Sequence, residues 1–439
     1  MLYRFIKVII GLAIRFYYKE IRVVDAHYLD EEGPIIIIAN HPNTLMDAWI
    51  MGHVNKRRVN FMAKATFFSS PLKRKLLGAL VIIPINRKAD GATEGVSNAA
   101  SFDACYQLLE NGGVLVVFPE GTSYLERKLR ELKTGTARIA LEVEKRNAGK
   151  LNVKIIPIGL NYIDADSFRG KVMVHVGKPI EIDPSLLAEY TVSQGKAAKQ
   201  LTERFRIELS RVFVTMDDQL KEEVGNDLRA LFDTKYAPEK DGVNSTIQLL
   251  RDMKSRMDEY SVVAPWKVQE IHLKSRALNV RLASAGIRSD FLDRSFRKTL
   301  YTRQYMQTVL FLIAAFPIFL FGLIHNGIQY FLIGKLVPKL TNEVEYHAPL
   351  VVLLGLVLYP TFYVLIAWGV NVWLQLSWIQ YFIYIGVLPF SGLFAHYYLK
   401  TYHHMRSKRK FSRFVTKRKA VFEELKNERE ALKSLIFND

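Results

Sequence analysis

Hydrophobic residues in the first part of the chain fall into short runs separated by longer segments with helical spacing. The runs are rich in isoleucine and valine and stand at 34–39, 80–85, 114–118, 153–160 and 172–177. Segments such as 97–110 and 134–146 repeat their apolar residues with helical periodicity. This alternation predicts an α/β fold, built on a mainly parallel sheet with helices on its faces.

The pattern changes after residue 189. Apolar residues then recur every three or four positions among charged ones, as at Leu201, Phe205, Leu209, Phe213, Met216 and Leu220. Such spacing indicates amphipathic helices, and a second helical stretch follows the break at 233–242. We therefore expect a charged helical domain between the sheet and the apolar C-terminal part.

Two long segments lack charged residues. Residues 348–395 contain no Asp, Glu, Lys or Arg, which is enough chain for two spanning helices of about 20 residues each. Residues 304–334 are also uncharged but fit neither one upright span nor two. We predict an integral membrane protein in which 348–395 crosses as a hairpin. We expect 304–334 to enter and return, interrupted at His325-Asn326-Gly327 and kinked at Pro317.

Basic residues flank this membrane part on both sides. Arg294, Arg297, Lys298 and Arg303 precede it, and the basic stretch 406–419 follows it. The positive-inside rule places both flanks in the cytoplasm, which requires an even number of crossings. The loop at 336–346 is then expected on the cytoplasmic side as well.

The N-terminal segment is apolar but carries Arg4, Lys7 and Arg15, and no cleavage site for a signal peptide follows it. We interpret it as an interfacial helix, with an amphipathic core helix as the alternative. The expected organisation is an N-terminal interfacial helix (1–26), an α/β domain (27–188), a charged helical domain (189–300), transmembrane and re-entrant helices (301–400) and a basic cytoplasmic tail (401–439).

The net charge indicates anionic partners. With 61 Lys+Arg against 43 Asp+Glu, the formal charge is +18, which favours anionic lipid, phosphorylated substrates or nucleic acid. A hydrophobic share of 49% weighs against nucleic acid. The single cysteine, Cys105, excludes an intrachain disulfide. Adjacent His403 and His404 lack the geometry of metal ligands, so we expect no metal.

Polar residues follow three of the predicted strands. Asn40-His41, Asn86-Arg87 and the PEGTS stretch at 119–123 each begin where an apolar run ends. Ligands of open α/β sheets bind beyond the carboxyl ends of the strands, so we expect these groups along one edge of the sheet.

His41 and Asp47 form the candidate catalytic pair. On one helix, their spacing would put them on different faces. Pro42 disfavours helix at His41 and suits a first helical turn, so the histidine is expected in the loop before the helix. An aspartate bound to one ring nitrogen would make the other a general base. The alternative is a loop histidine and a helix aspartate that never touch.

Five stretches match a known pattern. They read NHPNTLMD, IPINR, FPEGTS, LKTGTARIA and IIPIGL, in this order. Their order and spacing resemble the sequence blocks of the glycerol-3-phosphate and lysophosphatidate acyltransferase family, over residues 30–185. Five residues separate His41 from Asp47, one more than is usual in the family. This longer spacing resembles glycerol-3-phosphate and dihydroxyacetone-phosphate acyltransferases.

The resemblance implies a role for each matching residue. His41 and Asp47 match the catalytic pair, Arg87 matches the position associated with glycerol phosphate, and Glu120, Gly121 and Thr122 match the block that shapes the acceptor site. Ser123 stands where an arginine is usual. The candidates to replace that arginine at the phosphate are Arg127, Lys128 and Lys133.

The expected function is a membrane-bound O-acyltransferase of phospholipid biosynthesis. It would use acyl-CoA or acyl carrier protein as donor, glycerol-3-phosphate or dihydroxyacetone phosphate as acceptor, and no cofactor. Lysophosphatidate is the alternative acceptor. A non-catalytic membrane protein that binds or transports lipid, and a nucleic-acid-binding membrane protein, are alternatives of other classes. Anionic membrane lipids are expected partners of the basic tail, and the oligomeric state stays open.

Overall fold

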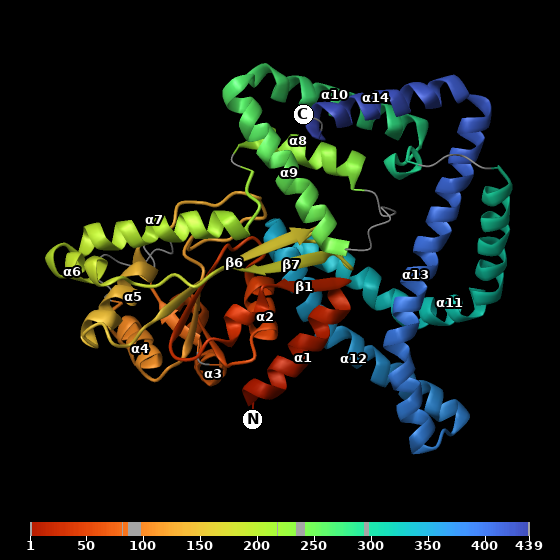
Figure 1. Cartoon of the computed structure of the whole chain (residues 1–439). Coiled ribbons are helices and arrows are strands. Elements are labelled where there is room, and N and C mark those ends of the chain that lie inside the picture. The colour runs from red at the N-terminus through yellow and green to blue at the C-terminus, as the bar shows by residue number, and fades with distance from the viewer. Residues whose placement is uncertain are drawn as a thin grey trace. The chain divides into compact units, whose positions relative to one another are not determined.

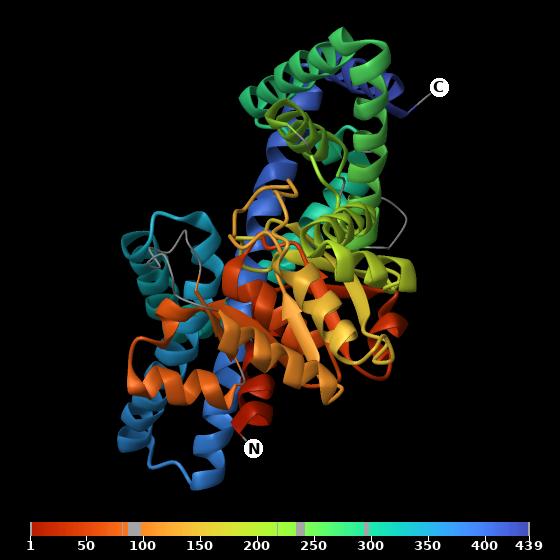
Figure 2. The same ribbon diagram turned by 90° about the vertical axis from the view of Figure 1, so that its left-hand side faces the viewer.

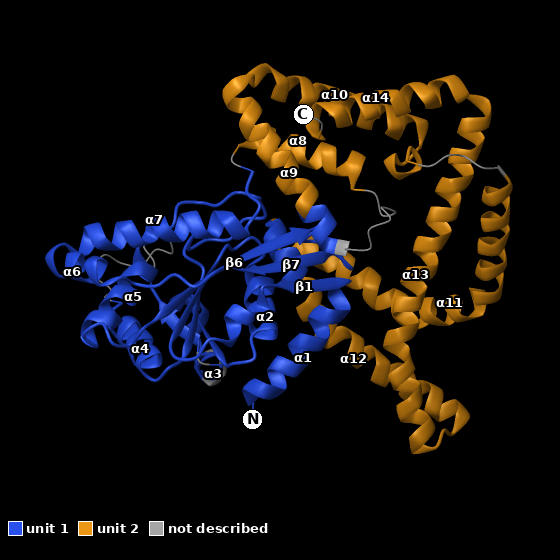
Figure 3. Ribbon diagram, viewed as in Figure 1, with its two compact units in different colours: residues 1–217, 242–247, 343–349 blue, residues 218–241, 248–342, 350–439 orange. Residues whose placement is uncertain are grey.

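The protein is described by a computed structural model that covers residues 2–80, 82–86, 98–216, 218–233, 242–293 and 298–437. Arg87, the predicted phosphate ligand, lies outside these residues. The chain divides into two compact units (Figure 3). Unit 1 comprises 1–217, 242–247 and 343–349, and unit 2 comprises 218–241, 248–342 and 350–439.

Unit 1 contains one seven-stranded sheet (Figure 1). Its strands are β1 (Glu20–Val24), β2 (Ile35–Ala39), β3 (Val59–Lys64), β4 (Ile82–Ile85), β5 (Val114–Val117), β6 (Lys154–Ile163) and β7 (Lys171–Val176). They lie in the order β1-β7-β6-β2-β5-β3-β4. Neighbours are parallel except for β6 and β7, which are antiparallel. The predicted fold class is therefore confirmed.

The helices of unit 1 cover this sheet. They are α1 (Leu2–Tyr17), α2 (Thr44–Val54), α3 (Pro71–Ala79), α4 (Ala99–Glu110), α5 (Gly135–Arg146), α6 (Pro184–Val192) and α7 (Gln194–Val212), with short 3-10 turns η1 (Ala26–Asp30), η2 (Ala65–Phe68) and η5 (Val344–Tyr346). Successive isoleucines of β2 point to opposite faces. All four are at most 1% exposed, so both faces of the sheet are covered.

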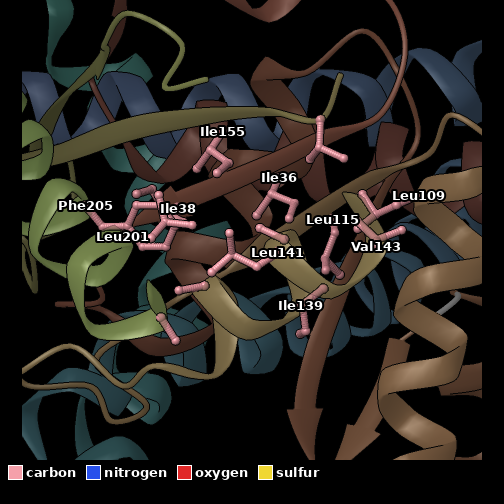
Figure 4. Close-up of a cluster of buried hydrophobic side chains, with 14 of the residues drawn as sticks. Ile36, Ile38, Leu109, Leu115, Ile139, Leu141, Val143, Ile155, Leu201 and Phe205 are labelled. Carbon is pink, nitrogen blue, oxygen red and sulfur yellow. The ribbon is translucent and has the colours of Figure 1, made fainter. Parts of the chain in front are cut away.

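A large cluster of buried hydrophobic side chains lies on one face of the sheet (Figure 4). Ile36 and Ile38 of β2 contribute to it together with residues of α4, α5 and α7. Leu201 and Phe205 of α7 are fully buried in this cluster. Unit 1 thus extends past residue 188, the expected domain boundary, because the first amphipathic helix beyond that point packs against the sheet.

Unit 2 is helical. It holds α8 (Gln219–Phe232), most of α9 (Gly242–Val263), α10 (Pro265–Ala285), η4 (Ser289–Phe291), α11 (Lys298–Leu340), most of α12 (His347–Leu374), α13 (Trp378–Lys417) and α14 (Lys419–Phe437). Arg429 of α14 is 3% exposed, donates to the carbonyl oxygen of Leu231 at 3.0 Å and pairs with Asp293. The segment expected as a basic tail is therefore the end of α13 and a docked helix.

Within the described residues, three helices are long and apolar enough to cross a membrane: Thr299–Leu340, Val344–Leu374 and Trp378–Lys417. The last two are joined by a short connection at residues 375–377 (Figure 2), as the predicted hairpin requires. α11 is one helix through Pro317 and follows a bent path (Figure 1). The predicted break at 325–327 is wrong, because the Asn326 side chain bonds Gly322 O at 2.9 Å and accepts from the Tyr363 hydroxyl at 2.6 Å within the helical packing.

Candidate active site

His41 and Asp47 meet at the carboxyl end of β2. His41 lies in the loop after the strand, α2 begins at Thr44, and Asp47 occupies its first turn. The Nδ1 atom of His41 lies 2.8 Å from the Oδ2 atom of Asp47. The structure thus brings the predicted pair into direct contact, with the histidine before the helix.

Two further donors bind the Asp47 carboxylate, which is fully buried. The backbone N–H of Asn43 donates to Oδ2 at 2.8 Å, and the Tyr162 hydroxyl donates to Oδ1 at 2.6 Å. An ionised carboxylate only accepts hydrogen bonds, so Nδ1 of His41 carries the proton in their contact. The lone pair of the ring is then on Nε2, which is the nitrogen able to take a proton.

The imidazole of His41 is also held by packing. Its ring stacks on Phe118 with centroids 4.0 Å apart and an angle of 10° between the planes. The His41 side chain is 19% exposed. The ring is therefore fixed on one face and at Nδ1, while part of it remains accessible to a substrate.

Glu120 joins the His41 loop to the turn after β5. Its Oε1 atom accepts the backbone N–H of His41 at 3.0 Å, and Oε2 accepts the N–H of Arg130 at 3.1 Å. β2 and β5 are parallel neighbours, so their carboxyl ends adjoin. Burial raises the pKa of Glu120, and the two N–H bonds act in the opposite direction. Both oxygens of the Glu120 carboxylate therefore accept hydrogen bonds from backbone N–H groups.

The other residues of the PEGTS turn, and Lys133 beyond it, are either exposed to solvent or hydrogen-bonded to neighbouring backbone. Gly121 has φ 73°, a left-handed conformation that favours glycine. Thr122 is exposed. Lys133 donates its backbone N–H to Pro119 O at 2.8 Å, while its side chain is 66% exposed and 3.5 Å from Glu131. Ser123, at the position of the usual arginine, accepts the backbone N–H of Thr44 through Oγ at 3.0 Å.

The sequence of this region matches a known family. Residues 20–161 match the family described as Acyltransferase. This part of the chain is an acyltransferase domain. It holds His41, Asp47 and Glu120, and stops one residue before Tyr162.

Three relatives and one solved structure are similar to parts of this chain. Glycerol-3-phosphate O-acyltransferases 1 and 2 of Saccharomyces cerevisiae are 31% and 27% identical over 32% and 25% of this chain, and over 19% and 15% of their own lengths. A 1-acyl-sn-glycerol-3-phosphate acyltransferase of Chlamydomonas reinhardtii is 26% identical over 29% of this chain and 34% of its own. The chain thus matches a minor part of each relative. The crystal structure of the 1-acyl-sn-glycerophosphate acyltransferase of Thermotoga maritima aligns with 46% of this chain and 79% of its own, at 19% identity and a TM-score of 0.31.

A segment from the C-terminal part of the chain completes the surroundings of the acyltransferase domain. Residues 343–349 belong to unit 1, and η5 packs against α2. The hydroxyl of Thr44 donates to the carbonyl oxygen of Glu345 at 3.0 Å. Thr44 has φ 42°, an unfavourable conformation for a β-branched residue. Its two hydrogen bonds, to Ser123 and Glu345, hold it there.

Of the remaining candidates that the structure describes, Asn86 and Cys105 supply no reactive group. The backbone of Asn86, after β4, forms two hydrogen bonds with the Asn98 side chain, at 2.9 and 2.8 Å. Cys105 is buried in α4, and burial raises the pKa of its thiol to about 12, so it is a poor nucleophile. Among the residues that the structure describes, no group of three or more His, Cys, Asp or Glu side chains could hold a metal.

Proposed function

We propose that this protein is a membrane-bound O-acyltransferase that transfers a fatty acyl group from acyl-CoA or acyl carrier protein to glycerol-3-phosphate or dihydroxyacetone phosphate. The observation that carries the proposal is the 2.8 Å contact between His41 and Asp47 inside an acyltransferase domain. The three long apolar helices support a membrane location. The names of the two yeast relatives support glycerol-3-phosphate as the acceptor.

The proposed reaction is a single displacement. The acceptor hydroxyl attacks the thioester carbonyl carbon while Nε2 of His41 takes its proton, and a tetrahedral intermediate forms. Asp47 stabilises the imidazolium and keeps the ring oriented. The intermediate collapses, the C–S bond breaks, and the leaving thiolate takes the proton from His41. The products are the ester and a free thiol, and His41 returns to its starting state. A positioned base of this kind contributes about 10²–10⁴-fold to the rate.

The other site residues have different proposed roles. Arg87 binds the acceptor phosphate, with Arg127, Lys128 or Lys133 supplying a second positive charge near it. Gly121 and Thr122 form the turn that faces the acceptor. Glu120, with both oxygens bound to backbone N–H groups, acts by positioning the His41 loop.

Lysophosphatidate is the second candidate acceptor, supported by the name of the algal relative. The higher identity to a yeast glycerol-3-phosphate enzyme favours the smaller acceptor. Incubating the purified full-length protein in detergent with each acceptor and labelled acyl-CoA separates the two, because the product is either a lysophospholipid or phosphatidate.

The decisive test of the reaction is His41→Ala. The variant should lose acyl transfer to every acceptor while its thermal unfolding stays that of the wild type. The matched control is His27→Ala, a substitution in η1 on the same domain, which should leave transfer unchanged. Undiminished transfer by His41→Ala would reject the mechanism.

A further inference from the structure

Behind the catalytic pair lies a buried set of polar side chains that ends on Asp47. Tyr162 of β6 is 7% exposed, and Tyr18, next to the end of α1, is 1% exposed. The Tyr162 hydroxyl donates to Oδ1 of Asp47 at 2.6 Å. This oxygen is the one that His41 does not use. Tyr162 thus binds the side of the carboxylate facing away from the imidazole.

The sheet explains why Tyr162 reaches this position. β6 pairs with β2 as far as Ile158, which faces Ala39 at the end of β2. Beyond that point β6 continues to Ile163, paired only with β7. The extra length carries Tyr162 past the end of β2, to the level of the first turn of α2, where Asp47 lies. The contact therefore follows from strand lengths and register.

Within this set, the Tyr162 hydroxyl points toward the carboxylate. A phenol has one proton, and Tyr162 gives its proton to Asp47. Tyr18 lies beside Tyr162, with ring centroids 5.9 Å apart, and the two hydroxyl groups interact. The side-chain amide of Asn43 donates in turn to the Tyr18 oxygen, at 3.4 Å, and to Ala165 O at 3.0 Å. Burial raises the pKa of each tyrosine well above the usual range, so both hydroxyl groups keep their protons.

We infer that Tyr162 is a positioning residue for acyl transfer, acting through Asp47 on the imidazole of His41. The inference rests on the proposed function. Oδ2 of Asp47 receives the Asn43 N–H and faces His41, while Oδ1 is bound only by Tyr162 among the described residues. These bonds fix the rotation of the carboxylate about its Cβ–Cγ bond. Without the hydroxyl, a buried charged oxygen loses its donor, and the carboxylate turns toward other partners and away from Nδ1.

The test is Tyr162→Phe, which removes the hydroxyl and keeps the ring. It should lower kcat roughly tenfold or more, as the loss of a hydrogen bond to a charged group does, with KM for donor and acceptor unchanged. The control is Tyr17→Phe, which removes a phenol hydroxyl of similar burial. That hydroxyl donates to the backbone oxygen of Asp166 at 3.0 Å, so the control should leave kcat unchanged.

A double-mutant cycle distinguishes positioning from general support of the fold. In an Asp47→Ala background, measured with labelled donor, Tyr162→Phe should cause no further loss of kcat, because its effect passes through the missing carboxylate. Tyr18→Phe removes the hydroxyl that interacts with Tyr162 and should show a smaller loss that also vanishes in this background. Should Tyr162→Phe fold poorly, Tyr18→Phe decides the question alone.

Two results would overturn the inference. One is wild-type kcat in Tyr162→Phe, and the other is the same loss of kcat in the wild-type and Asp47→Ala backgrounds. Failure of the proposed function is recognised separately, since it would appear as no acyl transfer by the wild type to any acceptor, and failure of the His41 mechanism as full transfer by His41→Ala, whatever Tyr162 does.

Discussion

Glu120 accepts the backbone N–H of His41 at 3.0 Å, so the residue that follows one strand of the sheet holds the loop that follows its neighbour. Its second oxygen accepts the N–H of Arg130 at 3.1 Å. A carboxylate is the only side chain of this size with two acceptor oxygens and no donor. The FPEGT stretch and the histidine loop are therefore parts of one hydrogen-bonded structure.

Glu120→Gln should damage both activity and stability. The amide keeps the shape of the side chain but presents an NH₂ group to one of two backbone N–H donors, which leaves that donor unsatisfied. We expect a loss of about 1–3 kcal/mol in the free energy of unfolding, together with a fall in kcat. Differential scanning calorimetry of the detergent-solubilised protein measures the change in stability, and kinetic assays measure the change in kcat. Glu126→Gln, which alters an exposed pair with Arg130, is the control and should change little.

The pH dependence of stability gives a second test of Glu120. Burial raises the folded-state pKa of this carboxyl above its ordinary value of 4.5, so the folded state holds the proton more tightly than the unfolded state. The contribution of Glu120 to stability is then most favourable at low pH and decreases as pH rises from 4.5 through the folded-state pKa. The stability of the wild type relative to Glu120→Gln should decline over that window. An increase with pH would contradict the raised pKa.

Asp47→Asn should be nearly as damaging as loss of the histidine. Three donors surround the carboxylate, from His41, Asn43 and Tyr162, and an amide offers them one oxygen. An amide NH₂ facing Nδ1 would reverse the tautomer of His41 and place the proton on Nε2, which abolishes the base. We expect kcat to fall by about 10³–10⁴-fold with KM little changed. A kcat of Asp47→Asn within tenfold of the wild-type value would show that the Asp47 carboxylate is not required by the mechanism.

Much of this arrangement follows from local sequence patterns. The runs of isoleucine and valine locate β2, β5 and β6 because central parallel strands are buried on both faces. β1 was not expected, since Glu20 and Arg22 break its apolar character. The pairing of His41 with Asp47 could be predicted because Pro42 places the histidine outside the helix.

Contacts between segments far apart in the sequence could not be predicted from local patterns. Tyr162 lies beyond the apolar run that marked β6, and its role depends on how far β6 extends past β2. The docking of Glu345 against Thr44 joins residues that are 301 positions apart. The continuity of α11 depends on Asn326 finding partners on α12 and α13, which composition does not reveal.

The bond between Thr44 and Glu345 should hold the 343–349 segment against the acyltransferase domain. Thr44→Val removes the donating hydroxyl with little change of shape, and Thr44→Ser keeps it. Amide hydrogen exchange over residues 343–349 should become faster in Thr44→Val by about 5–10-fold, the equivalent of one hydrogen bond. Thr44→Ser should stay close to wild type. Equal exchange in both variants would show that the segment is held by other contacts.

The same segment predicts the membrane topology. Because 343–349 packs within unit 1, the connection between α11 and α12 should lie on the membrane face that carries the acyltransferase domain. Single cysteines at Val344, at Val192 of the same unit and at Trp373 near the end of α12 test this, as these side chains are 42%, 89% and 89% exposed. The native Cys105 is buried and gives little background.

In sealed vesicles, an impermeant maleimide should label Val344→Cys and Val192→Cys from one side and Trp373→Cys from the other. This pattern means that α12 crosses the membrane, and that α13 returns to the first side if the basic end of the chain lies there. Labelling of Val344→Cys together with Trp373→Cys, and apart from Val192→Cys, would contradict the packing of η5 on α2.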